Sequence, residues 1–225
     1  MSLLAAVATD VNKMTWTAAL IAWVLAVPMF FAGKYLYVLA HEGGHAFLAV
    51  LLFRLVKGID IKKTGEGATL REKAMWPFGI LISAFGYLGP SLFGLLAAWL
   101  LLHDPAATVL WGSIAFLAVM LLATRGFLGP LLIICLMVAL YQIVTKAEPS
   151  IVALTAHVWT WFLLISGVQQ MLLFMRRREY TIKGNDTEAL RAATLLPTYV
   201  WGAILLLGSI AALAYGGAML LRLTN

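Results

Sequence analysis

The sequence predicts an all-α, polytopic membrane protein with about seven transmembrane helices, a small cytoplasmic hairpin loop and a single membrane-embedded domain over residues 1–225. Of its 225 residues, 63% are hydrophobic and 12% are charged, whereas soluble proteins average about 45–50% apolar and about 25% charged residues. The apolar residues gather into runs close to the roughly 20 residues that cross a bilayer. This composition excludes a disordered chain, and the single cysteine excludes an internal disulfide scaffold.

Seven apolar runs are expected to be the spans. Gly33 and Lys34 form only a weak break between the first two runs, so one long helix kinked at Pro28 is an open alternative. A cleaved signal peptide at the first run is disfavoured, because the run is long and no small-x-small cleavage site precedes Lys34. The runs are Trp16–Gly33, Tyr35–Leu55, Phe78–Leu102, Ala106–Ala123, Gly126–Val144, Ile151–Met175 and Leu196–Leu221.

The distribution of basic residues predicts the orientation. If the seven crossings alternate, thirteen Lys and Arg residues fall on the side of the N-terminus and three fall on the other side. Positive charge stays in the cytoplasm, so we expect a cytoplasmic N-terminus and an external C-terminus. The two longer loops, Val56–Trp76 and Arg176–Leu195, then both face the cytoplasm. Because the net charge of +6 flanks apolar runs, it indicates a lipid bilayer as partner and no nucleic acid.

The second run contains the sequence His-Glu-Gly-Gly-His, at residues 41–45. On a helix, positions i and i+4 share a face, so His41 and His45 can offer two imidazoles to one Zn²⁺. Glu42, beside them, can take the proton of a metal-bound water. Each ionisable group in a span costs about 2–3 kcal/mol, which indicates a function. The alternative is a polar patch between helices or a proton relay.

The residues around this motif predict close helix packing at Gly44 and a depth for the site. Gly44 forms a small-x-x-x-small pair with Ala40, which is typical of close helix packing, or it leaves room for a substrate beside the metal. Glu42 precedes Arg54 by 12 residues, about 18 Å along a helix axis. We therefore expect the site to lie within the bilayer, at a depth that water reaches only through a cavity.

A hairpin is expected in the loop that follows. Residues Ile59–Lys62 alternate in polarity, and Thr64–Gly67 is a turn signal. The hairpin could offer an edge strand to an unwound substrate, or it could be a short solvated loop.

Taken together, these features resemble the site-2-protease-type intramembrane zinc metalloproteases, and they are most similar to the small bacterial, peptidase-like branch. The resemblance extends over most of the chain, although only the His-Glu motif is highly specific. Its segments are Val38–Ala46, Gly58–Ile61 with Gly65–Thr69, Gly86–Gly94, and Asn185–Leu190 followed by Pro197 and Trp201.

The resemblance implies a third metal ligand, usually an Asp in an Asn-Pro-Asp-Gly or Leu-Asp-Gly motif, and this sequence has neither motif. Asp186 is the residue that we carry over as this ligand. The alternative is that Asn185 or Asp186 caps a helix, because Asn185 with Glu188 fits a capping box. His157 is a rival ligand, whose other interpretation is an interhelical hydrogen bond within an aromatic belt. Cys135 can bind metal in principle, but a lone cysteine more often packs as a small hydrophobe.

The motif and the resemblance predict an integral membrane zinc endopeptidase of the bacterial inner membrane, with Zn²⁺ as cofactor. In this interpretation His41, His45 and Asp186 bind the ion, Glu42 is the catalytic base, and the substrate is a membrane-embedded or membrane-adjacent polypeptide. Two other functions stay open. One is a proton or metal-ion transporter that uses the same residues, and the other is an inactive relative that binds membrane partners.

Overall fold

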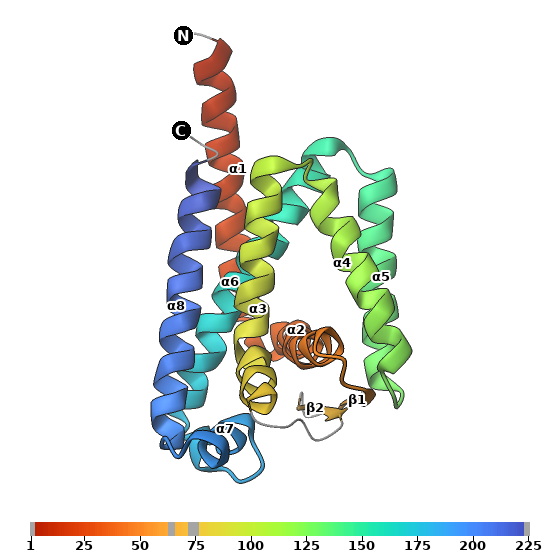
Figure 1. Cartoon of the computed structure of the whole chain (residues 1–225). Helices are drawn as coiled ribbons and strands as arrows, with labels where there is room; N and C mark the ends of the chain where they lie inside the picture. The colour runs from red at the N-terminus through yellow and green to blue at the C-terminus, as the bar shows by residue number, and fades with distance from the viewer. Residues whose placement is uncertain (1–2, 63–65, 72–76, 223–225) are drawn as a thin grey trace.

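The computed structural model describes residues 3–62, 66–71 and 77–222, and Figure 1 shows that they form a bundle of long helices with a short hairpin at one end. The described elements, in chain order, are α1 (Leu3–Ala26), α2 (Phe30–Leu51), β1 (Val56–Ile61), β2 (Gly67–Arg71), α3 (Phe78–His103), α4 (Ala107–Ala123), α5 (Leu128–Lys146), α6 (Pro149–Arg176), the 3-10 turn η1 (Glu179–Thr181), α7 (Asp186–Thr194) and α8 (Thr198–Arg222).

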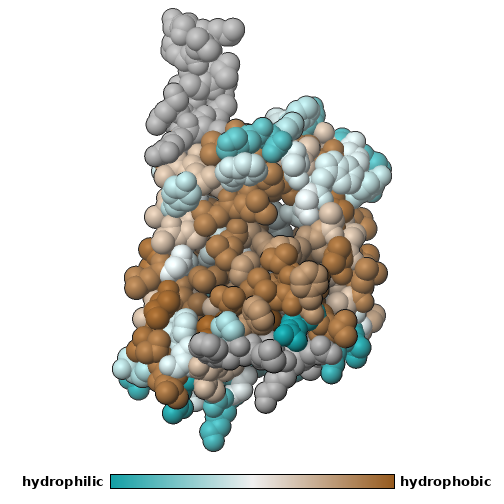
Figure 2. All heavy atoms as spheres, viewed as in Figure 1, coloured by the Kyte–Doolittle hydropathy of each residue, from teal (hydrophilic) through white to brown (hydrophobic). Residues whose placement is uncertain are grey.

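Four helices of the described chain, α3, α5, α6 and α8, are long and apolar enough to cross a membrane. Helices α1 and α2 meet this criterion only as a bent pair, which brings the count to five, and α4 is a shorter apolar helix of 17 residues. Figure 2 shows hydrophobic residues over the middle of one face and hydrophilic residues toward its ends. The protein is therefore an integral membrane protein built from α-helices, and the predicted count of seven spans is not confirmed.

The direction of α2 departs most from the prediction. The axes of α1 and α2 differ by 96°. Pro28 lies at the break and has no backbone N–H to donate to the preceding turn, so α1 ends there. In Figure 1, α2 is seen nearly end-on, whereas α3, α4, α5 and α8 run along the bundle. Residues 16–55 thus form two helices, and the second lies across the bundle.

The two ends of the bundle carry different parts of the chain. Helix α1 begins and α8 ends at the same end (Figure 1). The opposite end, called the hairpin end below, holds β1, β2, the turn between α4 and α5, and α7. The prediction that the N-terminus shares a side with the hairpin, and lies opposite the C-terminus, is therefore wrong. The physical reason is the bend at Pro28, because α2 runs sideways and does not carry the chain back across the membrane.

The predicted hairpin is present in the structure. Strand β1 pairs antiparallel with β2, with Ile59 opposite Thr69 and Ile61 opposite Gly67. Ile59 and Ile61 are buried, while Asp60 between them is exposed, which matches the alternation in the sequence. The predicted turn residues at 64 and 65 lie outside the described residues.

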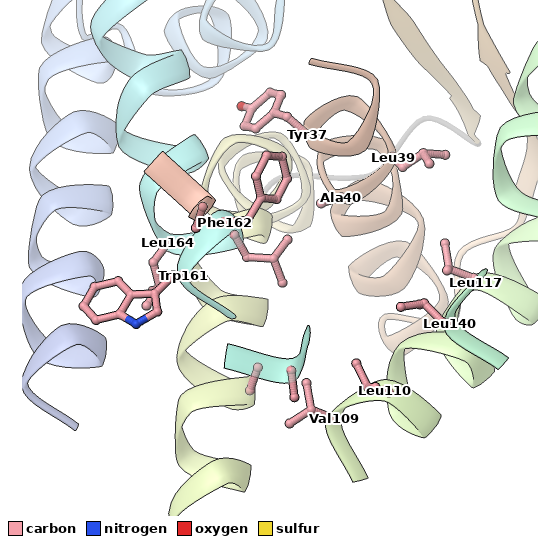
Figure 3. Close-up of a cluster of buried hydrophobic side chains, with 14 of the residues drawn as sticks. Tyr37, Leu39, Ala40, Val109, Leu110, Leu117, Leu140, Trp161, Phe162 and Leu164 are labelled. Atoms are coloured by element: carbon pink, nitrogen blue, oxygen red, sulfur yellow. The ribbon is translucent and has the colours of Figure 1, made fainter. Parts of the chain in front are cut away.

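The core packs α2 closely against α3 and α6. A Cβ built on Gly44 would lie 2.7 Å from the carbonyl oxygen of Phe85 and 3.3 Å from the Cα of Gly89, so the absence of side chains lets the two backbones approach. Figure 3 shows Phe162 of α6 next to Tyr37 and Ala40 of α2. The expectation of tight packing at Gly44 agrees with this contact, which holds α2 in its crosswise position.

Candidate metal centre

Three of the predicted site residues come together at the hairpin end. His41 and His45 lie one turn apart on α2, and Asp186 is the first residue of α7. The Oδ2 atom of Asp186 lies 2.9 Å from Nε2 of His45 and 3.5 Å from Nε2 of His41. One ligand atom from each residue lies within 4.8 Å of the others, and no other such group of His, Cys, Asp and Glu occurs among the described residues.

His45 is held in one orientation by α3. Its Nδ1 lies 2.8 Å from the carbonyl oxygen of Ile82, which can only accept, so Nδ1 carries the proton and donates it. Nε2 then faces Asp186. In the neutral ring Nε2 carries the lone pair that a metal ligand needs, and in the doubly protonated ring it donates a hydrogen bond to the Asp186 carboxylate. A Cβ built on Gly86 would overlap the His45 ring, so the glycine of α3 makes room for this imidazole.

His41 occupies a more open position than His45. Its side chain is 13% exposed, against 5% for His45. The Tyr37 hydroxyl lies 3.5 Å from its Nδ1, and the Tyr87 ring meets its ring edge to face at a centroid distance of 4.9 Å. Tyr37 and Tyr87 therefore both contact the His41 imidazole.

The sequence leaves open whether Asn185 or Asp186 caps α7, and the structure shows that Asn185 is the cap. Oδ1 of Asn185 accepts from the backbone N–H of Glu188 at 2.8 Å, so Asn185 caps α7. Its amide also donates to the carbonyl oxygen of Glu179 at 2.8 Å. The side chain of Asp186 is thereby left to face the histidines. Burial alone would raise the pKa of Asp186, but hydrogen bonds from His41 and His45 outweigh it and hold this pKa below its usual range.

The depth of the site in the bilayer stays a prediction, but the helix that carries the site runs differently from the expectation. The expected separation of about 18 Å between Glu42 and Arg54 assumes one helix along the membrane normal, whereas α2 ends at Leu51 and lies across the bundle (Figure 1). The separation is therefore lateral, and the centre lies at the hairpin end. Helix α7 lies at the same end, so Asp186 reaches the histidines without its loop entering the middle of the bundle.

Glu42 lines the same cavity as His41, His45 and Asp186, and its carboxylate contacts strand β2. Its residue is 4% exposed, and its Oε2 accepts a hydrogen bond of 2.7 Å from the Thr69 hydroxyl of β2. Strand β2 therefore contacts the glutamate side chain directly.

A cavity of about 410 Å³ opens at the centre. Tyr37, Tyr87 and Thr69 have no role in the sequence interpretation, although Tyr37 stands one turn before His41 and the other two fall in the segments of the family resemblance. The cavity is lined by the His41, His45 and Asp186 side chains, by residues of β2 and by further acidic residues. Among the described residues, the lining contains no Lys or Arg. It consists of Tyr37, Val38, His41, Glu42, His45, Glu66, Gly67, Ala68, Thr69, Tyr87, Gln170, Phe174, Glu179, Gly184, Asn185 and Asp186.

Comparison with known families agrees with this geometry. A model of the peptidase M50B-like family matches residues 14–216. The chain belongs to the peptidase M50B-like family. The match spans both α2 and α7, the two elements that supply the converging side chains. Peptidases of this family are metalloproteases, so the function is of the membrane metalloprotease type. No curated protein and no solved structure matches the chain.

The structure does not bring the other candidate ligands of this M50B-like protein into the group. His157 is 5% exposed in α6, and its Nδ1 donates to the carbonyl oxygen of Ala153 at 2.8 Å. Cys135 is exposed on α5. Among the described residues, the geometry favours Asp186 over His157 as the partner of the two motif histidines.

Proposed function

We propose that this protein is a zinc endopeptidase that hydrolyses peptide bonds of membrane-embedded or membrane-adjacent polypeptides. The convergence of His41, His45 and Asp186 from α2 and α7 is the observation that supports this proposal. Residues 141 positions apart meet at hydrogen-bond distance, next to a buried glutamate and a polar cavity.

The donor set fits zinc. Two imidazole nitrogens and one carboxylate oxygen are a ligand set of catalytic zinc sites, which keep a fourth position open for water or substrate. The cavity of about 410 Å³ offers space at that position. A Zn²⁺ ion bound there would polarise the scissile carbonyl and lower the pKa of a bound water. The hydrogen bond from His45 to Ile82 sets the tautomer that a metal ligand needs.

Glu42 is the proton carrier in this proposal. It takes a proton from the attacking water as the oxygen–carbon bond forms at the scissile carbonyl. It returns that proton to the leaving nitrogen as the carbon–nitrogen bond breaks, which gives a free amine and a carboxylic acid that keeps the other proton of the water. The two histidines and Asp186 would hold the ion, and the ion would supply the polarisation of the carbonyl and of the water.

The location of the centre indicates which part of a substrate's span would be cleaved. Because the cavity lies at the hairpin end, the scissile bond would lie near the end of a substrate's span rather than at its middle. A helical substrate would have to unwind locally there, since its backbone carbonyls are engaged in helical hydrogen bonds. Span ends are where helices fray most easily.

We also propose that the hairpin end faces the cytoplasm of a bacterial inner membrane, and that the N-terminus lies on the other side. Positive residues stay in the cytoplasm. Lys13 and Lys146 lie toward the opposite end of the bundle. The hairpin end carries Arg54, Lys57, Lys62, Arg125, Arg176, Arg177, Arg178, Lys183 and Arg191.

The test combines zinc content with cleavage. Detergent-purified protein incubated with Zn²⁺ and dialysed should hold about one zinc per chain and should cleave fluorescent casein or a synthetic single-span peptide. Glu42→Ala should keep the zinc and lose at least about 100-fold in cleavage rate. Equal cleavage by Glu42→Ala and the parent protein would refute the mechanism. Zinc without cleavage would indicate an inactive relative, and ion flux into liposomes without zinc would indicate a transporter.

A further inference from the structure

Strand β2 makes direct contact with the proposed proton carrier. The Thr69 hydroxyl lies 2.7 Å from Oε2 of Glu42 and 3.2 Å from the backbone carbonyl oxygen of the same residue. A Cβ built on Gly67 would overlap the Glu42 carboxylate, so the backbone of β2 packs directly on this side chain. The glutamate is therefore held by the strand at two points.

The strand is itself fixed to the bundle. Thr69 lies opposite Ile59 of β1 in the hairpin register. Ile59 is fully buried, and its carbonyl oxygen accepts a hydrogen bond of 2.7 Å from the backbone N–H of Arg125. On the other edge of β1, Ile59 forms a parallel bridge with Thr124. These contacts link the turn between α4 and α5 to Glu42 through the hairpin.

The helix alone does not aim Glu42 at the metal. Successive residues on an α-helix point in directions about 100° apart, so a glutamate next to His41 does not share the face of the two histidines. A glutamate side chain also has several rotatable bonds, and fixing them requires a partner. Of the described residues, Thr69 is the one whose side chain donates a hydrogen bond to the Glu42 carboxylate.

We propose that Thr69 is a positioning residue, which fixes the Glu42 carboxylate in one orientation for the transfer of the proton of the attacking water. The inference deepens the proposed function and rests on Glu42 acting as the proton carrier. Thr69 itself contacts neither the water nor the scissile bond. The role predicts a loss in turnover with little change in metal or substrate binding.

Three variants distinguish a positioning role of the Thr69 hydroxyl from a purely structural role. Thr69→Val removes the hydroxyl but keeps the β-branched shape, and should lower kcat about 10-fold with KM within about twofold. Thr69→Ser keeps the hydroxyl and should retain most of kcat. Thr155→Val is the matched control, because it removes an exposed hydroxyl that is bonded to the carbonyl of Ile151 on α6. All three should bind as much zinc as the parent protein, measured by elemental analysis.

A second measurement tests the contact without activity. Thermal unfolding in detergent is followed for Thr69→Val, Glu42→Ala and the double variant. The shifts in midpoint should be non-additive, because each single variant removes the same hydrogen bond. Additive shifts, or a Thr69→Val variant as active as the parent protein, would overturn the positioning role. A parent protein that binds zinc but cleaves neither probe would refute the proposed function, while the unfolding cycle would still decide the Thr69–Glu42 contact.

Discussion

Two buried histidines on apolar helices, His45 of α2 and His157 of α6, differ in what their second ring nitrogen meets. Their exposed fractions are 4% and 5%, and the Nδ1 of each donates to a backbone carbonyl at 2.8 Å. Nε2 of His45 lies 2.9 Å from Asp186. Nε2 of His157 has no hydrogen-bond partner within the described part of the chain. Residue type and burial are thus equal, and only the partners distinguish the two positions.

The origin of those partners explains the difference. His157 bonds to a carbonyl four residues earlier in its own helix, so its contact reflects local helix geometry. His45 bonds to α3 and α7, at sequence separations of 37 and 141 residues. Convergence of distant elements around a donor is what a metal site requires, because one helix face can supply only two well-placed ligands.

The strongest test of this comparison is zinc content after removal of each histidine. His45→Ala should lower the zinc content from about one to below about 0.1 per chain, because a ligand and its tautomer control are both lost. His157→Ala should leave the content unchanged. Elemental analysis of protein dialysed against the same buffer measures both. Equal zinc loss in the two variants would place His157 in the centre and contradict the geometry.

A test with a smaller expected effect compares the roles of Asn185 and Asp186 at the start of α7. Asp186→Ala should weaken zinc binding more than about 100-fold in a chelator competition, because a charged ligand is removed. Asn185→Ala should leave zinc binding within a few-fold. It should lower the free energy of unfolding by about 1 kcal/mol, since it removes the helix cap. If Asn185→Ala weakened zinc as strongly as Asp186→Ala, the cap and the ligand would not be separate.

The parts of the fold that the sequence predicts well depend on local pattern. The long apolar runs appear as α3, α5, α6 and α8, and the alternation around Ile59 appears as β1. The spacing of His41 and His45 places both on one helix face, and the capping signal of Asn185 is realised at the start of α7. Each of these features is decided by residues within a few positions of one another.

The parts that the sequence misses depend on contacts between distant elements. A proline at position 28 predicts a break or a kink, but the 96° turn that lays α2 across the bundle is set by its packing on α3 and α6. That one angle joins α1 and α2 in a bent pair in place of two separate crossings, and it brings the start of α1 to the same end as the end of α8. The contact between Thr69 and Glu42 is equally invisible in sequence, because it depends on where the hairpin folds back.

The smallest expected effect concerns Nε2 of His157, which has no hydrogen-bond partner among the described residues. His157→Leu replaces a buried polar ring by an apolar side chain, and it removes a donor or acceptor that has no partner among the described residues. Such a change relieves a desolvation cost, so the midpoint of thermal unfolding in detergent should rise by about 2–4 °C. Thr160→Val is the control, because the Thr160 hydroxyl already bonds to the carbonyl of Ala156 at 2.7 Å, and its loss should give no rise. A fall in the midpoint of His157→Leu, or a loss of zinc, would show that His157 has a partner of its own, and the contrast with His45 would then disappear.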